Sequence, residues 1–260
     1  MKYGNGANYW LVEGSHADIS RGAMSTATIE LDEQRGTLEF DPARSALIII
    51  DMQNFFCSPL LDRPDGTLKL VPAIASAVKS GRRLGMKIVW VNWGNRPDTA
   101  NLPPNMLYSL RANGPTHIGR PLPGDMGLAL VKDSWSAAIV DELKDSCDES
   151  DYVIEKYRTS GFPGTILDQT LRASGINTLF YAGVNLDQCV MFTLLDAAFL
   201  GYDNVHLKDC TATTSPPYAA EGALYNMRNR TFTASSESLL AAVVTRKQPN
   251  AEMEAAHEVR

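Results

Sequence analysis

The sequence predicts an α/β fold in which a parallel sheet carries helices on both of its faces. Two observations support this: short runs of continuous apolar, β-branched residues, and stretches between them with apolar residues at helical spacing. Because the two patterns alternate along the chain with short connections, the strands are expected to be parallel and doubly wound. A length of 260 residues fits one large domain or two small ones, with a core that needs no disulfides.

The alternation begins with a buried strand in the segment Ser45-Ala-Leu-Ile-Ile-Ile-Asp51. A helix is predicted over residues 68–84, capped by Gly85, and a second strand over 87–92. The later elements are expected to be a short helix at 137–143, a strand at 151–155, a helix at 166–174, a strand at 178–183, a helix at 187–200, a strand at 204–208, a helix at 218–228, a strand at 231–233 and a helix at 237–244. Residues 93–130 lack either pattern and contain six prolines, which is typical of a lid or a binding loop.

The two ends of the chain differ from this pattern. Residues 1–40 are rich in glycine and dotted with aromatic residues, and Thr26–Leu31 could form an edge strand. We expect an N-terminal extension or arm over 1–40, a main domain over 41–246 and a polar, frayed C-terminal tail over 247–260.

Composition limits the classes of function. The chain carries 24 Lys and Arg against 30 Asp and Glu, and a net charge of −6 argues against binding to a nucleic-acid backbone, which needs a basic face. No stretch approaches the roughly 18 apolar residues of a membrane span, and the first 24 residues lack the apolar region of a secretory signal. We therefore expect a soluble protein that binds neither nucleic acid nor membrane.

The four cysteines, Cys57, Cys147, Cys189 and Cys210, are widely spaced and form no C-x-x-C pair. Neither a zinc module nor a disulfide framework is expected from such spacing, and a reduced, cytoplasmic location follows. The sequence also lacks histidine-based metal motifs, a Walker A loop and a dinucleotide fingerprint. We therefore expect no metal and no cofactor.

Cys189 is the sharpest candidate for chemistry, because it lies where a buried strand is predicted to turn into a long helix. The free N–H groups of a helix N-terminus stabilise a thiolate and an oxyanion, so a lowered pKa is expected for this thiol. The other three cysteines are expected to be small buried side chains, the common role of free cysteine.

A nucleophilic cysteine needs a base, and no histidine directly follows a predicted strand, so no histidine is expected in the site. Asp51 ends one predicted strand and Lys156 follows another, and ligands of parallel sheets bind at such carboxyl ends. Asp51 is therefore the candidate base, and Lys156 would keep it ionised. The alternatives are a turn-forming or helix-capping Asp51 and a surface Lys156 whose stem packs on the domain.

Three segments carry a family likeness. Ile48-Ile-Ile-Asp-Met-Gln-Asn54, Val153-Ile-Glu-Lys-Tyr-Arg-Thr-Ser-Gly-Phe162 and Ala182-Gly-Val-Asn-Leu-Asp-Gln-Cys-Val190 resemble the signature segments of the isochorismatase-like cysteine hydrolases, in the same order. The resemblance implies a three-layer α/β/α fold with a six-stranded parallel sheet.

The same resemblance implies roles for individual residues. Asp51, Lys156 and Cys189 match the Asp-Lys-Cys triad of the family. A cis peptide bond is implied between Val184 and Asn185, which would turn the N–H of Asn185 beside that of Cys189 to form an oxyanion hole.

Within the family, retention of Cys189 favours the branch that cleaves amides. Nicotinamidases carry metal-binding histidines after the second strand, whereas residues 92–98 contain none. The chain most resembles ureidoacrylate amidohydrolases, through residues 132–143 and 159–162, and then biuret hydrolases, through residues 95–98 and 102–103.

The expected activity is cysteine-dependent hydrolysis of a C–N bond in a small amide or a ureido or carbamoyl compound, through an acyl-enzyme. Phe56, Asn92, Trp93 and Thr159 flank the motifs and are expected to bind the substrate. Two alternatives remain: a vinyl-ether hydrolase that acts on isochorismate through Asp51 alone, and a non-catalytic binding module. The resemblance implies a homodimer or homotetramer, to which the N-terminal arm could contribute.

Overall fold

The centre of the molecule is a six-stranded, all-parallel sheet. The computed structural model describes residues 1–32, 36–61, 67–110 and 117–247. In spatial order the strands are β11 (Phe232–Ala234), β10 (Asp203–Ala212), β9 (Thr178–Val184), β6 (Ser45–Ile50), β7 (Lys87–Trp93) and β8 (Tyr152–Lys156). The chain starts this sheet in the middle, at β6, adds β7 and β8 on one side and then β9, β10 and β11 on the other. The prediction of a doubly wound parallel sheet is confirmed.

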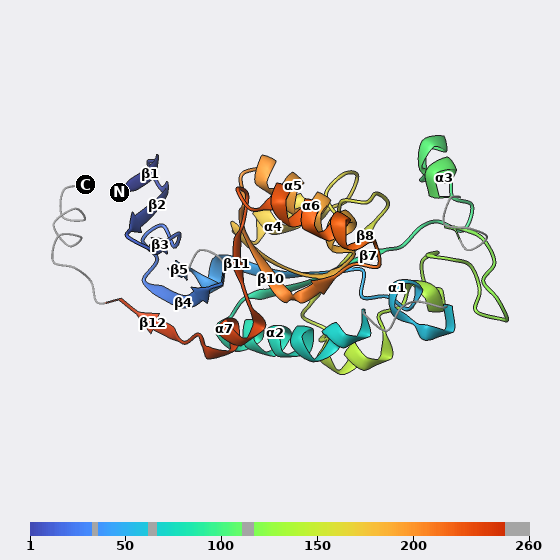
Figure 1. Cartoon of the computed structure of the whole chain (residues 1–260), viewed down its shortest axis with the longest axis horizontal. Coiled ribbons are helices and arrows are strands. Elements are labelled where there is room, and N and C mark those ends of the chain that lie inside the picture. Colours follow the sequence, from blue (N-terminus) through green and yellow to red (C-terminus); the bar gives the residue numbers. More distant parts are fainter. Residues whose placement is uncertain (33–35, 62–66, 111–116, 248–260) are drawn as a thin grey trace.

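Helices cover both faces of this sheet (Figure 1). The helices α4 (Leu167–Ala173), α5 (Met191–Phe199) and α6 (Pro217–Met227) lie on one face, and α2 (Val71–Leu84) and α7 (Ser236–Ala241) lie on the other. The three-layer α/β/α arrangement expected from the sequence is therefore present.

Strand β6 shows why its sequence is apolar throughout. Its side chains alternate between the two faces of the sheet. Leu47 and Ile49 pack into the core cluster that contains the apolar side of α2, whereas Ile48 and Ile50 pack into the cluster beneath α4 and α5. All four side chains are completely buried, so a strand with helices on both faces needs an apolar residue at every position.

Helix α2 is amphipathic and ends where the sequence predicts. Its apolar positions Ile74, Ala77 and Val78 face the core at helical spacing. Gly85 follows with φ of 89°, and its N–H donates to the carbonyl oxygens of Arg82 and Gly81. A left-handed residue at this position closes the helix, which glycine does without a Cβ penalty.

The N-terminal residues form the strands of a second sheet. Its spatial order is β1 (Lys2–Asn5), β2 (Asn8–Glu13), β3 (His16–Asp18), β5 (Gly36–Phe40), β4 (Ser25–Leu31) and β12 (Val244–Arg246). The segment expected as an edge strand is thus β4, which pairs on both sides. The helix expected to reach residue 244 ends at Ala241, because the chain then extends to pair β12 with β4.

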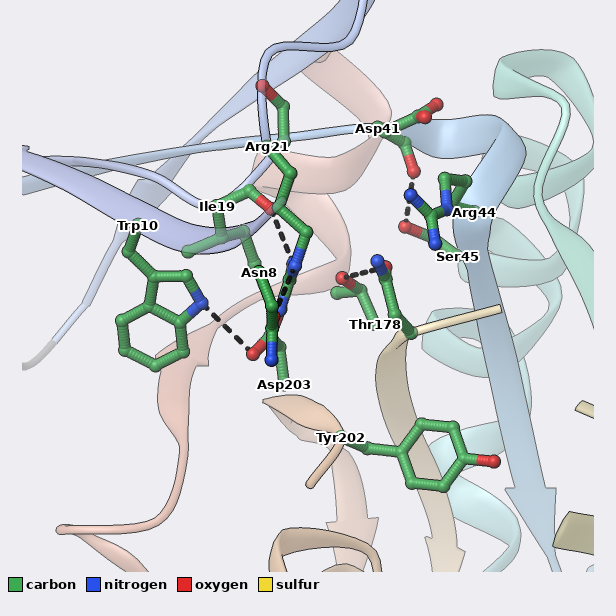
Figure 2. A network of polar contacts seen from close by, with 12 residues as sticks. Asn8, Trp10, Ile19, Arg21, Asp41, Arg44, Ser45, Thr178, Tyr202 and Asp203 are labelled. Carbon is green, nitrogen blue, oxygen red and sulfur yellow. Dashed lines mark hydrogen bonds and ion pairs between the residues drawn. The ribbon is translucent and has the colours of Figure 1, made fainter. Parts of the chain in front are cut away.

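The second sheet is fastened to the central one by a buried polar contact (Figure 2). Arg21 Nη1 lies 2.6 Å from Asp203 Oδ2 at the start of β10, and Trp10 Nε1 donates to Asp203 Oδ1 at 3.0 Å. The Arg21 guanidinium also donates to the carbonyl oxygen of Ile19 at 2.8 Å and to Asn8 Oδ1 at 2.8 Å. Both charged side chains are more than nine-tenths buried.

Two other segments differ from the sequence prediction. The helix expected at 137–143 is replaced by the 3₁₀ turns η5 (Trp135–Ala137) and η6 (Asp141–Ser146). Between them the chain is extended, because the N–H of Val140 donates to Met52 O at 3.0 Å and Ile139 forms a bridge with Gln53. The helix expected at 187–200 divides into the π-helical turn η7 (Leu186–Val190) and α5.

The long segment between β7 and β8 contains one α-helix, α3 (Pro104–Leu110), among the residues that the structure describes. It lies at the end of the molecule opposite the N-terminal sheet (Figure 1). The remaining short elements are η1 (Pro42–Arg44), α1 (Asn54–Cys57), η2 (Pro59–Leu61) and η3 (Leu68–Leu70). In the described parts of the chain, none of the helices has the length and apolarity that crossing a membrane requires.

Candidate active site

Three residues from separate strand ends meet at the carboxyl edge of the central sheet. Lys156 Nζ lies 3.0 Å from Asp51 Oδ2 and 3.3 Å from Cys189 Sγ. Asp51 follows β6, Lys156 ends β8 and Cys189 lies in the turn after β9. Parallel strands bring their carboxyl ends to one edge, so Asp51 becomes a neighbour of two residues that lie more than 100 positions further along the sequence. The structure thus brings together the three predicted catalytic residues.

Asp51 is held rigidly and away from water. It has φ of 54°, and its N–H donates to the carbonyl oxygen of Val91 in β7 at 3.1 Å. Positive φ is uncommon for residues other than glycine, and here it turns the chain out of β6 directly after the strand. The side chain of Asp51 is completely buried, and its carboxyl group interacts with the Lys156 ammonium group, the Cys189 thiol and the backbone N–H of Trp93.

Lys156 is the cation of the site and is also completely buried. Its ammonium group donates to the carbonyl oxygens of Arg158 at 3.2 Å and Thr159 at 3.3 Å. The β7–β8 register places Trp93 opposite Lys156, and Nζ lies 3.8 Å from the centroid of the indole ring. Ion pair, carbonyl contacts and cation–π contact together fix the ammonium group between the carboxylate and the thiol.

A short π-helical turn positions Cys189. Gly183, at the end of β9, has φ of 109°, and a Cβ there would lie 2.0 Å from the carbonyl oxygen of Ile50. Only glycine therefore permits the close approach of β9 to β6 at this point. The next peptide bond, Val184–Asn185, is cis, as the family resemblance implies. The carbonyl oxygen of Cys189 accepts a hydrogen bond from Thr193 Oγ1 at 2.6 Å, which ties the turn to α5.

Ionisation of the thiol and the carboxyl group is governed by burial. Burial, reinforced by the neighbouring negative charge of Asp51, raises the pKa of Cys189 to about 12, although the positive charge of Lys156 opposes the increase. The expectation of a lowered pKa at a helix N-terminus is therefore wrong. Burial also raises the pKa of Asp51, and its contacts with Lys156 and Cys189 offset only part of the increase.

The other cysteines lie outside this cluster. Cys57 and Cys210 are buried, as expected for small packing side chains, but Cys147 is exposed. It follows η6, at the surface turn before β8, so the expectation that it would be buried is wrong.

A cavity of about 70 Å³ opens above the thiol. Three of the four residues predicted to bind substrate line it with Cys189, namely Phe56, Trp93 and Thr159. The remaining lining residues are Phe55, His117, Ile118, Leu130 and Gln188. The cavity is thus mostly apolar, with a few polar groups that could orient a small ligand.

Asn92 is not brought to this cavity. It lines a separate hollow of about 250 Å³ with Lys132 and Glu155, whose charged groups lie 2.6 Å apart. Trp93 lines both cavities. Successive side chains of a strand point to opposite faces, which is why Asn92 and Trp93 do not face the thiol together.

Two residues of the site region escaped the sequence reasoning. His117 lines the cavity beside Cys189, so the expectation that no histidine lies in the site is wrong. His117 belongs to the 93–130 segment, which has no periodic pattern of apolar residues. The sequence therefore predicts a binding loop from the length of this segment, but not which of its residues reach the site. Gln53 holds Trp93 in place, since its amide donates to Trp93 O at 2.8 Å and accepts from Trp93 N at 3.0 Å.

Across the described residues, no group of three or more His, Cys, Asp and Glu side chains is arranged to hold a metal ion. The chemistry that these residues themselves can supply is nucleophilic attack by sulfur, proton transfer by a carboxylate and charge stabilisation by an ammonium group.

Comparison with known proteins places this site in a family. The isochorismatase domain matches residues 45–238. The chain belongs to the isochorismatase family. The ureidoacrylate amidohydrolase RutB of Cronobacter sakazakii is 35% identical over 206 residues, which are 77% of this chain and 88% of the relative.

Solved structures agree with the assignment. An isochorismatase family protein from Desulfovibrio vulgaris superposes with a TM-score of 0.63 at 29% identity, and covers 75% of this chain and 96% of its own. An N-carbamoylsarcosine amidase from Thermoplasma acidophilum gives a TM-score of 0.58 at 28% identity, with coverage of 75% and 97%. The expected family and fold are confirmed, and this isochorismatase-family chain is a hydrolase. The family match runs from the start of β6 to residue 238, so every strand of the N-terminal sheet lies outside it.

Proposed function

We propose that this hydrolase cleaves a C–N bond of a small amide, ureido or carbamoyl compound through a covalent acyl-enzyme on Cys189. The observation that carries the proposal is the contact of thiol, carboxylate and ammonium groups beneath a small cavity. Relatives named as a ureidoacrylate amidohydrolase and an N-carbamoylsarcosine amidase support the choice of bond.

In the first half of the reaction, Asp51 removes the proton from Cys189 as sulfur attacks the substrate carbonyl carbon. A carboxylate with a raised pKa is a stronger base than an ordinary one, which suits this transfer. The tetrahedral intermediate collapses when the C–N bond breaks and Asp51 returns the proton to the leaving nitrogen. Ammonia or an amine leaves, and the acyl group remains on sulfur.

In the second half, water attacks the acyl carbon while Asp51 accepts one of its protons. The C–S bond breaks, the product acid leaves, and the proton returns to the Cys189 sulfur, which restores the free enzyme. Lys156 keeps its positive charge throughout and stabilises whichever of its two neighbours is anionic.

The oxyanion of each tetrahedral intermediate is assigned to the backbone N–H groups of Asn185 and Cys189. Both belong to the turn after β9, which the cis bond before Asn185 begins. Two such donors commonly account for a large part of the rate acceleration in acyl transfer. In this proposal Phe56, Trp93 and Thr159 enclose the substrate, and no metal or other cofactor takes part.

Assembly and location extend the proposal. We propose a cytoplasmic homodimer or homotetramer that binds neither nucleic acid nor membrane. All four cysteines are free thiols, which suits a reducing compartment. Light scattering after size-exclusion chromatography measures the number of subunits, and a monomer would contradict this part of the proposal.

Release of ammonia or amine from a panel of small amides, ureides and carbamoyl compounds tests the proposed reaction. We expect the Cys189→Ala variant to lose at least about 1,000-fold in kcat, because no other group can form the covalent intermediate. Denaturing the wild-type enzyme during turnover should reveal an acyl group on Cys189 by mass spectrometry.

Cys147→Ser is the matched control, since Cys147 is exposed and outside the site, and we expect it to keep wild-type activity. Wild-type amidase activity in Cys189→Ala would contradict the proposal. Pyruvate release from isochorismate by that variant would instead favour a vinyl-ether hydrolase, and absence of any turnover would favour a binding module.

A further inference from the structure

We infer that the outer face of α5 and α6 is the surface through which two copies of this chain associate. The inference rests on the assembly part of the proposed function, because it names the surface on which the subunits meet. It is independent of the chemistry at Cys189. It also gives a role to four aromatic side chains that belong neither to the core clusters nor to the wall of the active-site cavity.

Each of the two helices carries an exposed pair of aromatic residues. Phe192 and Phe199 of α5 are 45% and 72% exposed. Tyr218 and Tyr225 of α6 are 74% and 62% exposed. The members of each pair are seven residues apart, which is two helical turns, so they share one side of their helix. Other residues form the buried side of the two helices, namely Thr193, Leu194, Ala197, Ala223 and Met227.

The two aromatic pairs lie on one continuous face. Strands β9 and β10 are parallel neighbours, and the helices that follow them pack against each other on the same side of the sheet (Figure 1). Both helices return from the carboxyl edge of the sheet toward its amino edge. Phe192 and Tyr218 therefore lie toward the active-site edge, and Phe199 and Tyr225 lie toward the opposite edge.

The exposed aromatic area is large enough to drive association. An aromatic side chain presents about 150–250 Å², so the exposed fractions of the four rings amount to about 500 Å². The largest apolar patch on a monomeric protein is about 300–600 Å² and is often functional. Each partner in a stable complex buries about 800 Å². The four rings would supply more than half of that area, and the neighbouring Leu200, 43% exposed, adds to it.

The few charges on this face are arranged to suit a second copy of the same chain. The charged residues of the two helices are Asp196, which is half-buried, Glu221 and, at the C-cap of α6, Arg228. Within the described parts of the chain, neither Glu221 nor Arg228 forms an ion pair. The Arg228 guanidinium lies 3.9 Å from the centroid of the Tyr225 ring, so this positive charge borders the aromatic patch.

Glu221 and Arg228 are seven residues apart, at nearly equal distances on either side of Tyr225. A two-fold axis that passes near Tyr225, perpendicular to α6, sets the two α6 helices antiparallel. Each Glu221 then lies opposite Arg228 of the partner subunit, because a two-fold interface is built from the same surface on both copies. A face with charges of one sign would repel its own copy, whereas this face is complementary to itself.

Size-exclusion chromatography with light scattering and analytical ultracentrifugation of the full chain test the inference. We expect the wild type to have at least twice the 28.4 kDa mass of one chain. Phe199→Glu puts a charge into the apolar contact, and we expect it to halve the number of subunits and to raise the dissociation constant at least about 100-fold. Its circular dichroism spectrum should be unchanged, because Phe199 lies outside the core.

A charge exchange separates contact between subunits from a structural role. Glu221→Arg and Arg228→Glu each place like charges opposite one another, and each should weaken association at least about tenfold. The double variant restores opposite charges in exchanged positions, so it should recover most of the wild-type affinity. Leu240→Glu is the matched control, since Leu240 is 51% exposed on α7 at the other face of the sheet, and we expect it to leave association unchanged.

A wild-type number of subunits in Phe199→Glu, or a double variant as weak as the single ones, would overturn the inference while leaving an oligomeric wild type in agreement with the proposed assembly. Binding of the wild type, but not of Phe199→Glu, to phosphatidylcholine vesicles would assign this face to a membrane and would also overturn it. A monomeric wild type would contradict both the inference and the proposed assembly. Hydrolysis through Cys189 is measured separately and survives any of these results.

Discussion

The thiol of Cys189 and the carboxyl group of Asp51 are both shielded from water, and in each case burial opposes the charged form. Lys156 touches both and favours either anion. One negative charge on this thiol–carboxyl pair, beside the single ammonium group, is therefore more stable than a negative charge on both groups. The resting site has its thiol protonated, and the sulfur becomes nucleophilic only as Asp51 takes the proton.

Alkylation by iodoacetamide tests this distribution of charge. For the wild type, the rate at Cys189 should rise with pH without levelling off near neutrality, because burial and the charge of Asp51 raise the pKa of this thiol to about 12. Asp51→Asn removes the negative charge and leaves Lys156 in place. We expect the midpoint of the pH profile to move down in this variant, while hydrolysis is lost for want of a base.

The rate is read at each cysteine separately by mass spectrometry, with the exposed Cys147 as the internal reference. Its profile should be the same in both proteins. A midpoint for Cys189 that stays in place or moves up in Asp51→Asn would show that the carboxylate does not control the thiol.

At the scale of single residues, the sequence predicts the site residues that directly follow a strand. Asp51, Lys156 and Cys189 follow strands whose apolar runs are unmistakable, and parallel strands must present such residues at one edge. His117 follows no strand, so nothing in its neighbours marks it. Asn92 does lie at a strand end, but its side chain is on the opposite face of the sheet from the thiol. A shift of one residue exchanges the two faces of a strand, and strand ends predicted from sequence are not that exact.

At the scale of single elements, β10 carries a buried titratable group that the reaction does not use. His206 is only 1% exposed, and its Nε2 lies 2.7 Å from Thr211 Oγ1. This bond spans the interval in which the pairing of β10 with β9 is irregular. Burial, reinforced by the positive charge of Lys208, lowers the pKa of His206 to about 4, and Asp209 opposes the shift only weakly.

This pKa predicts that stability falls in mild acid. A histidine with a folded pKa of about 4 and an ordinary value near 6.5 takes up its proton in the unfolded chain first. The stability that neutral His206 contributes is therefore complete above about pH 6.5 and is lost as the pH falls toward 4. The pKa difference corresponds to about 3 kcal/mol of unfolding free energy, measurable by urea denaturation at several pH values.

The control is His206→Gln, whose amide nitrogen can still reach Thr211 but does not titrate. We expect this variant to be less stable than the wild type at pH 7 and to lose less stability between pH 7 and pH 4.5. An equally steep loss in the two proteins would assign the acid sensitivity to other groups.

Elements were predictable where one periodicity dominates. Helix α2 buries one apolar stripe, and strands β6, β7 and β9 are buried on both faces. Their patterns of apolar residues are therefore strong. The region around Val140 is different, because its local pattern suits a helix while its backbone pairs with Met52 and Gln53. A hydrogen bond to a segment almost ninety residues away leaves no local signature, and tertiary pairing overrides weak helical propensity.

At the scale of the whole molecule, the two sheets are joined by an ion pair that is buried away from solvent. Arg21 and Asp203 have side chains 7% and 5% exposed, and burial raises the pKa of Asp203 although Arg21 opposes the increase. The contact lies at the amino edge of the central sheet, opposite the active-site edge. It therefore bears on how the N-terminal sheet is held rather than on catalysis.

We expect Arg21→Ala to lower the free energy of unfolding by about 3–5 kcal/mol, because it leaves the buried Asp203 carboxyl group without its counter-charge. Limited proteolysis should also cut within residues 1–40 faster than in the wild type. Chemical denaturation followed by circular dichroism measures the first effect, and peptide mapping the second.

Arg172→Ala provides the comparison, since the Arg172–Asp168 pair is exposed at 53% and 38%, and pairs of this kind contribute less than about 1 kcal/mol. Similar losses in the two variants would mean that the buried pair does not fasten the sheet. Wild-type activity in Arg21→Ala, where it remains folded, would agree with the distance of this contact from Cys189.

The sequence by itself determined the doubly wound parallel sheet, the family and the three residues that meet at its carboxyl edge, because each depends on local patterns read at strand ends. Only the tertiary structure decided the rest. The N-terminal strands are short and partly exposed, and one edge of their sheet is completed by β12 from the far end of the chain. The ionisation of Cys189 depends on burial, and the presence of His117 in the cavity depends on the path of a loop. Burial and long-range loop paths are properties of packing, which the spacing of residues along a chain does not record.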